Sequence, residues 1–139
     1  MKLLCFQAKR FRWKTHSKTL PEVADQDIDQ TVEAAVVIFM QAEADDAEEE
    51  RKNSVLRQAL KHIKWLANKR KLVNIVLHSF AHLGANAATP SFAESTITGI
   101  AQRLREAGYR VWITPFGYFC EWDLSVYGES LAKVWKEIR

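Results

Sequence analysis

The sequence predicts a single α/β domain over residues 1–139, with a mixed sheet and three main helices. Two short β-branched and aliphatic runs, 33–41 and 72–79, have the pattern of strands that are buried on both faces. Segments with apolar residues at helical spacing follow both runs. This alternation is typical of α/β folds with parallel strands. A chain of 139 residues can bury a core without disulfides or a structural metal.

The N-terminal half is expected to supply two strands and one helix. Residues 1–14 begin apolar and then alternate, which predicts an edge strand or hairpin arm. Residues 15–30 contain several aspartates without periodicity and predict a long exposed loop. The run 33–41 is then the central strand. From about Asp46 to Arg70 apolar residues recur at helical spacing, with acids at the start and bases at the end, as suits a helix dipole.

A strand, helix and strand unit follows. The run 72–79 is the first strand, and Thr89 with Pro90 predicts the N-cap and first residue of a helix. Gly108 supplies the left-handed residue that ends such a helix. Residues 109–114 then return as a strand, so the unit is long enough for a right-handed parallel crossover.

The C-terminal part is expected to hold a hairpin and a third helix. Residues 115–117 break the pattern and 118–127 form an aromatic-rich strand, which suggests a tight hairpin. The last helix is predicted to begin near Glu129, because an apolar stripe follows at helical spacing. The stripe consists of Leu131, Val134, Trp135 and Ile138.

Composition favours an ordinary globular protein, with 47% hydrophobic and 27% charged residues. No apolar run approaches the ~20 residues that span a bilayer, and Met1 opens on a strand-like segment rather than a signal peptide. We therefore expect a cytoplasmic protein. Cys5 and Cys120 are the only cysteines and do not form a zinc-ligand pattern, so no metal and no cofactor are expected.

Charge is segregated along the chain. Residues 1–20 carry only bases, 21–50 only acids and 51–72 only bases. Such runs are either solvated faces or a surface that contacts phosphates, and charge alone does not distinguish these interpretations. If RNA is the partner, the predicted contacts are the bases on the solvent side of the helix that begins near residue 46. These are Arg57, Lys61 and Lys64.

The segment His78–Pro90 is the first candidate for a functional site. In open α/β sheets, ligands bind beyond the carboxyl ends of the strands, where loops lead into helices. This segment presents His82, Asn86, small residues and a helix N-terminus that favours an anion. Alternatively, His82 is only a satisfied loop donor.

Three motifs at fixed order carry a family resemblance: FAHL at 80–83, TPS at 89–91 and TPFGYF at 114–119. With them the chain resembles the editing domain at the N-terminus of archaeal threonyl-tRNA synthetases, which has the fold of D-aminoacyl-tRNA deacylases. The match is clearest from Phe80 to about Val134 and extends more weakly to Met1.

The resemblance implies a homodimer that hydrolyses tRNA bearing serine in place of threonine. It implies a site built largely from main-chain groups, where water attacks with help from the ribose hydroxyl of the substrate. Because the chain has no synthetase catalytic or anticodon-binding region, we expect it to act in trans, alongside a threonyl-tRNA synthetase. The implied histidine is His82, and the implied substrate-binding residues are Phe80, Ala81, Glu43, Pro115, Phe116, Gly117, Tyr118 and Phe119.

The chain departs from the family pattern at several positions. Phe119 and Cys120 stand where the family has tyrosine and lysine, Lys133 stands in place of an acid in the predicted last helix, and Gln7 in place of a histidine. One hypothesis is that Lys133 restores the missing cation. Another is that the site binds tRNA or a partner protein without turnover, and a third is hydrolysis of a different ester. Cys120 near His82 also suggests a thiol nucleophile, although a buried inert cysteine is the commoner case.

Overall fold

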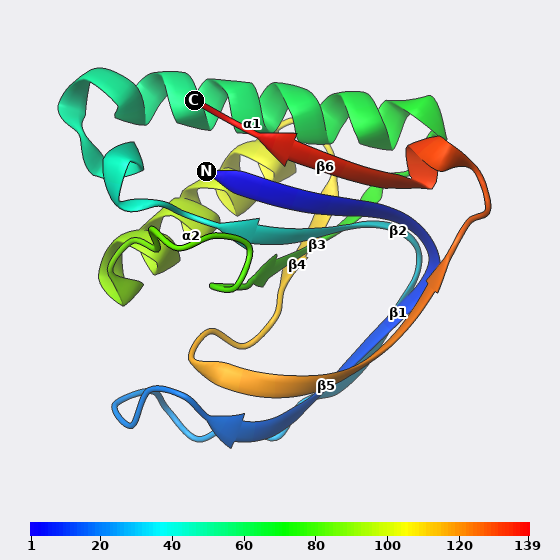
Figure 1. Cartoon of the computed structure of the whole chain (residues 1–139). Coiled ribbons are helices and arrows are strands. Elements are labelled where there is room, and N and C mark those ends of the chain that lie inside the picture. Colours follow the sequence, from blue (N-terminus) through cyan, green and yellow to red (C-terminus); the bar gives the residue numbers. More distant parts are fainter.

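The computed structural model describes all residues from Met1 to Arg139. Figure 1 shows two helices packed on a strongly curved sheet, with both termini near the helical layer. The strands and helices, in chain order, are β1 (Lys2–Lys18), β2 (Asp29–Gln41), α1 (Glu49–Lys69), β3 (Asn74–Ser79), α2 (Pro90–Glu106), β4 (Arg110–Ile113), β5 (Tyr118–Val126) and β6 (Lys133–Glu137).

The six strands form one mixed sheet in the order β4-β3-β2-β1-β5, with β6 also paired to β1. β2, β3 and β4 run parallel, whereas β1 is antiparallel to β2, β5 and β6. The predicted parallel crossover from β3 through α2 to β4 is therefore confirmed. Thr89 caps α2 by accepting a hydrogen bond from the amide of Phe92, and Gly108 has φ +98° after the last turn, as predicted.

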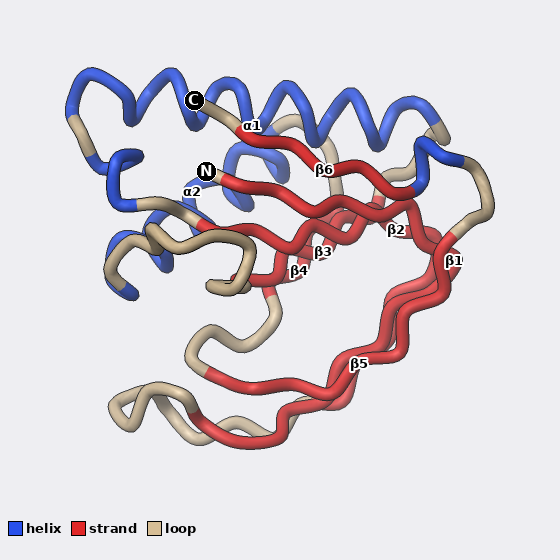
Figure 2. The backbone as a smooth tube through the Cα atoms, viewed as in Figure 1, coloured by secondary structure: helices blue, strands red, loops and turns tan.

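β1 is a central strand rather than an edge strand, but the alternative prediction of a hairpin arm is confirmed, since β1 is antiparallel to the next strand, β2. Its first half, Lys2–Phe6, pairs with β6, and its second half, from Ala8, pairs with β5. Register shifts interrupt the second ladder at Ala8/Arg10 and at Thr15/Ser17. Such bulges bend a strand and increase its twist. The sheet consequently curls, and β5 lies well below β3 and β4 (Figure 2).

Two hydrophobic cores occupy the two faces of the sheet. The larger core lies under the helices and includes Ile38, Ile63 and Leu104, each without exposed surface. The smaller core lies in the concave face and contains Phe11 and Phe39. Neither helix is long and apolar enough to cross a membrane.

The third helix was predicted wrongly. Residues Ser130–Ala132 form one 3₁₀ turn and Lys133–Glu137 form β6. Val134 packs on the larger core whereas the side chain of its neighbour Trp135 is exposed. Val134 and Ile138 are four residues apart, so helical and alternating strand periodicities both place them on one face, and pairing with β1 decides the conformation.

The predicted hairpin between β4 and β5 was also wrong. The two strands lie at opposite ends of the strand order and do not pair. Residues 114–117 instead cross the open mouth of the curled sheet (Figure 2). This short connection turns the concave face into a cleft.

Candidate functional site

A cleft of about 420 Å³ lies where the chain crosses the mouth of the sheet. The end of β3, the start of α2 and the connection from β4 to β5 form its walls. Phe80, Ala81 and His82 line one side, and the run Thr114–Cys120 lines the other. The first and third motifs found in the sequence thus share one cavity.

Gln41 fixes the loop that carries His82. Its side chain is buried and its Oε1 accepts hydrogen bonds from the amides of Leu83 (2.7 Å) and Gly84 (2.8 Å). Its Nε2 donates to the carbonyl of Gly84 at 3.0 Å. One buried amide therefore satisfies three backbone groups of a single turn. This role of Gln41 was not predicted, and its only signal in the sequence is a polar residue at the end of an apolar strand.

His82 stands at the rim of the cleft. Its side chain is exposed and donates or accepts no hydrogen bond within the chain. The imidazole meets the ring of Phe80 edge-on, with the centroids 5.3 Å apart and the planes at 77°. Phe80 in turn packs on Phe39 at 5.5 Å. The imidazole is held against an aromatic support but keeps both nitrogens available to a ligand.

His78 and Thr114 form a buried polar pair in the cleft wall. His78 Nδ1 and Thr114 Oγ1 are 2.7 Å apart, and the ring of Trp122 meets the imidazole at 5.0 Å. Burial lowers the pKa of His78 to about 4, so its imidazole is neutral near pH 7. His78 begins the candidate segment predicted from the sequence, but its pairing with Thr114 was not predicted.

Gly117 and Tyr118 fasten the loop of residues 19–28 to the cleft. The Gly117 carbonyl accepts a hydrogen bond from the amide of Thr19 at 2.7 Å. The Tyr118 hydroxyl donates to the carbonyl of Ala24 at 2.9 Å and accepts from the amide of Gln26 at 2.8 Å. The tyrosine hydroxyl is thus engaged by this loop, while the tyrosine side chain contributes to the cleft wall.

Several peptide groups around the cleft have no partner in the chain. The amides of Ala81 and His82 on one side, and of Phe116 and Gly117 on the other, donate no hydrogen bond. A backbone N–H group without a partner in the chain remains free to donate a hydrogen bond to water or to a ligand. The cleft therefore offers main-chain donors from two walls.

Replacing Gly117 by alanine is expected to cost about 2 kcal/mol of unfolding free energy, since the residue has φ +80°. A Cβ there would lie 2.8 Å from Val23 Cγ1. Urea unfolding measures the loss. Gly128→Ala is the matched control, because no atom lies within 4 Å of its added Cβ and its φ is not positive. Equal stability of the two variants would contradict the proposed strain.

Comparison with known proteins identifies the family. The model of the Archaea-specific editing domain of threonyl-tRNA synthetase matches residues 1–138. This chain belongs to that family. It is 30% identical over 140 residues to a threonine–tRNA ligase of Methanosphaera stadtmanae and 31% identical over 143 residues to one of Staphylothermus marinus. These alignments cover 99% and 100% of the chain but only 22% of either ligase.

A solved structure supports the fold of this editing-domain chain. The c-Myc DNA Unwinding Element Binding Protein superposes with a TM-score of 0.73 over 100% of this chain and 99% of its own. The sequence identity is 13%, so this likeness concerns the fold alone.

Cys120 lines the cleft of this editing domain, but its surroundings do not favour the thiolate. Its side chain is partly buried, and burial raises the pKa of the thiol above its ordinary value. A nucleophilic cysteine needs a depressed pKa. Phe119 beside it is 59% exposed and contributes apolar surface at the mouth. The cleft contains no lysine or arginine.

Lys133 does not line the cleft of its own chain. It lies on β6 rather than on a helix, and its ammonium donates to the carbonyls of Tyr127 (3.0 Å) and Gly128 (3.3 Å). The compensation hypothesis therefore lacks a geometric basis within one chain. Gln7 is also structural: it is buried, and its Nε2 donates to the carbonyl of Leu66 at 2.9 Å.

Glu43 likewise lies outside the cleft. Its carboxylate binds the N-terminal ammonium of Met1 at 2.9 Å and the ammonium of Lys2. Burial opposes the charge of Glu43, but these two partners lower its pKa. No three His, Cys, Asp or Glu side chains are grouped as metal ligands.

Proposed function

We propose that this chain removes serine from mischarged tRNA of the threonine isoacceptor, by hydrolysis of the terminal ester. Membership of the editing-domain family supports the reaction class. The observation that carries the proposal is the single cleft lined by both Phe80–His82 and Pro115–Phe119. The proposal includes action in trans, which the isolated 139-residue chain can test directly.

The proposed mechanism depends on main-chain groups rather than on a charged side chain. In this mechanism the free amides of Ala81 and His82 stabilise the negative charge that develops on the ester oxygen. In the same mechanism those of Phe116 and Gly117, residues of the other wall, orient the acylated adenosine. His82 holds the terminal ribose, and the attacking water is activated by the substrate hydroxyl.

Deacylation of purified substrates tests the proposal. The chain is incubated with seryl-tRNA and threonyl-tRNA of the threonine isoacceptor, and the remaining ester is followed with time. We expect loss of serine and retention of threonine, and His82→Ala should slow the loss. Equal hydrolysis of both esters, or of neither, would overturn the proposed specificity.

A second candidate function is a binding module without turnover. The absence of lysine and arginine from the cleft favours it, because no ammonium is available there to assist water. In this case the chain retains acylated tRNA but leaves both esters intact. Hydrolysis of another aminoacyl ester, a third candidate, would appear as turnover of a substrate other than seryl-tRNA.

The compensation hypothesis for Lys133 has its own test. Its ammonium is held by two carbonyls on β6, so we expect Lys133→Met to leave the rate of seryl ester hydrolysis at the wild-type level. A rate that falls with the lysine would restore a role for this cation, supplied across a subunit interface.

We propose a homodimer as the assembly, as the family resemblance implies. The exposed Trp135 on β6 supports this, since large apolar side chains on an outer strand favour an interface. Light scattering measures the mass directly. A threonyl-tRNA synthetase working alongside is the proposed source of the mischarged substrate.

A further inference from the structure

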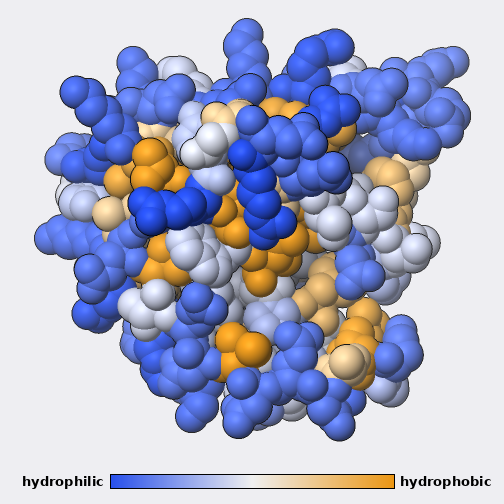
Figure 3. All heavy atoms as spheres, turned by 180° about the vertical axis from the view of Figure 1, so that it is seen from behind, coloured by the Kyte–Doolittle hydropathy of each residue, from blue (hydrophilic) through white to orange (hydrophobic).

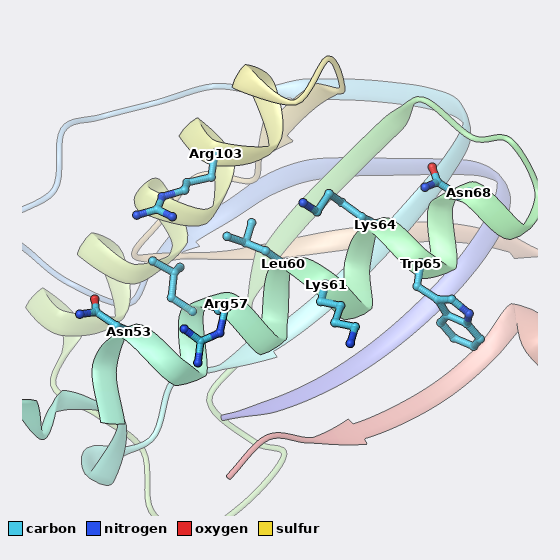
Figure 4. A pocket seen from close by; sticks show the side chains of 9 residues that line it. Asn53, Arg57, Leu60, Lys61, Lys64, Trp65, Asn68 and Arg103 are labelled. Carbon is cyan, nitrogen blue, oxygen red and sulfur yellow. The ribbon is translucent and has the colours of Figure 1, made fainter. Parts of the chain in front are cut away.

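A second surface outside the cleft is an open groove between α1 and α2, with a volume of about 850 Å³. Figure 4 shows that Arg103 extends from α2 and that the other labelled side chains come from α1. The groove has a short apolar floor made by Leu56 and Leu60. Its polar rim consists of Asn53, Arg57, Lys61, Lys64, Asn68 and Arg103.

The four cations of this rim are not neutralised by the protein. Arg57, Lys61, Lys64 and Arg103 form no salt bridge within the chain. The segment from Arg51 to Leu72 contains no acidic residue. The groove therefore presents a positive field that a polyanion would complement.

The cations of the rim lie in a row rather than in one cluster. Arg57, Lys61 and Lys64 are four and three residues apart and share one side of α1, which places them along about 10 Å of helix. Arg103 faces them from α2. A row of three charges on one wall with a fourth on the other suits a chain of phosphates better than a single small anion.

Trp65 adds a surface for a base. Its indole is 43% exposed at the end of the groove, although such a ring is usually buried. Lys69 lies over the ring with its Nζ 5.9 Å from the centroid. An exposed aromatic ring beside a row of cations is the arrangement by which proteins hold single-stranded nucleic acid.

The groove leads toward the cleft along α2. Asn53 and Leu56 also line a smaller cavity that contains Phe92 and Ser95 in the first turns of α2. Pro90 and Ala93 of the same turns line the cleft. From Arg103 to Pro90 the helix spans about 20 Å.

Seen from behind, hydrophilic side chains project along the upper edge, where α1 lies in Figure 1, with apolar surface exposed below them (Figure 3).

We infer that the α1–α2 groove binds the sugar-phosphate backbone of RNA next to the acylated end, with an unpaired base stacked on Trp65. Arg57, Lys61, Lys64 and Arg103 contact phosphates and give affinity without reading sequence. This inference deepens the proposed function, on which it rests for the identity of the RNA, by naming where the body of the tRNA lies.

The salt dependence of binding to deacylated tRNA of the threonine isoacceptor tests the groove. Four phosphate contacts predict that affinity falls about 50- to 150-fold between about 50 and 200 mM salt. The triple variant Arg57→Gln, Lys61→Gln, Lys64→Gln keeps one contact, so its affinity should fall only about threefold over the same range. Lys61→Gln alone should reduce the logarithmic slope by about 0.7–0.9.

Matched variants complete the binding test. Lys9→Gln, Arg10→Gln and Lys14→Gln remove the same charge from β1, outside the groove, and should keep the wild-type slope. Trp65→Ala should weaken binding at least about fivefold with the slope unchanged. A groove variant that keeps the wild-type slope while circular dichroism shows it folded would overturn the inference, as would equal losses in the β1 variant.

A minimal substrate separates the groove from the cleft. The 3′-seryl ester of adenosine has no RNA body, so the groove triple variant should hydrolyse it at the wild-type rate while its KM for seryl-tRNA rises about tenfold or more. Failure of the proposed function would appear as no hydrolysis of either substrate while binding to deacylated tRNA persists. If the triple variant kept the wild-type KM for seryl-tRNA, the RNA-binding role of the groove would be wrong, while the proposed function would stand.

Discussion

Replacing Gln41 by leucine should destabilise the protein by about 3 kcal/mol and abolish most of the proposed activity. Two amides and one carbonyl, at Leu83 and Gly84, lose their partner when this buried side chain becomes apolar. Each unsatisfied buried polar group costs about 1–3 kcal/mol, and partial exposure of this turn lets water recover some of it. Urea unfolding at pH 7 measures the change in the free energy of unfolding.

Activity should respond to this substitution beyond the loss of stability. The turn at Leu83 and Gly84 directly follows His82, so its release moves the imidazole and the two free amides that line the cleft. A displacement of about 1 Å in a positioned group can reduce a rate about 100-fold. Gln102→Leu, on the exposed face of α2, is the control. If a stably folded Gln41→Leu protein cleaved seryl-tRNA at the wild-type rate, the positioning role would be wrong.

The parts of this fold that local sequence determines were predicted correctly. β2, β3, α1 and α2 have either an unbroken apolar run or apolar residues at helical spacing, and their burial fixes their conformation. The cap at Thr89 and the positive φ at Gly108 follow from chemistry within a few residues. The conformation of such elements can be predicted from the sequence because it does not depend on which strand or helix they pack against.

The errors concern elements whose conformation depends on β1. Residues 133–137 become a strand because Leu4 and Cys5 of β1 pair with them, which no local pattern reveals. The prediction of a hairpin between β4 and β5 was wrong because β5 pairs with β1, on the far side of the sheet from β4. Long-range pairing of this kind overrides weak local periodicity.

The site was only partly predicted from the sequence, again because distant parts of the chain come together in it. The two motif turns were predicted to meet, and they line one cavity. Gln41 and the partner of His78 were missed because both residues lie in strands and contact distant parts of the chain, the loop after β3 and Thr114. Glu43 was assigned from the family resemblance and Lys133 from the compensation hypothesis, but ion pairs hold Glu43 and carbonyls hold Lys133 outside the cleft. The position of the two turns was therefore predicted correctly, whereas the direction of individual side chains was not.

Acid should unfold this protein through His78. The pKa of this imidazole is lowered by burial from 6.5 to about 4, and only 5% of its surface is exposed. Between these two pH values the unfolded chain binds a proton that the folded chain does not, so the free energy of unfolding falls as pH drops. The fall begins near pH 6.5 and ends near pH 4. Its size is about 3 kcal/mol, at about 1.4 kcal/mol for each pH unit.

A double variant isolates this contribution. His78→Phe with Thr114→Val replaces both members of the pair at once, so neither is left as an unpaired buried polar group. Carboxylates such as Asp29 also lose stabilisation in acid, because Arg12 lowers the pKa of Asp29, but that loss is common to both proteins. Urea unfolding at intervals from pH 7 to pH 4 should therefore show a shallower decline in the variant. An NMR titration that placed the pKa of the His78 imidazole near 6.5 would contradict its burial as a neutral group.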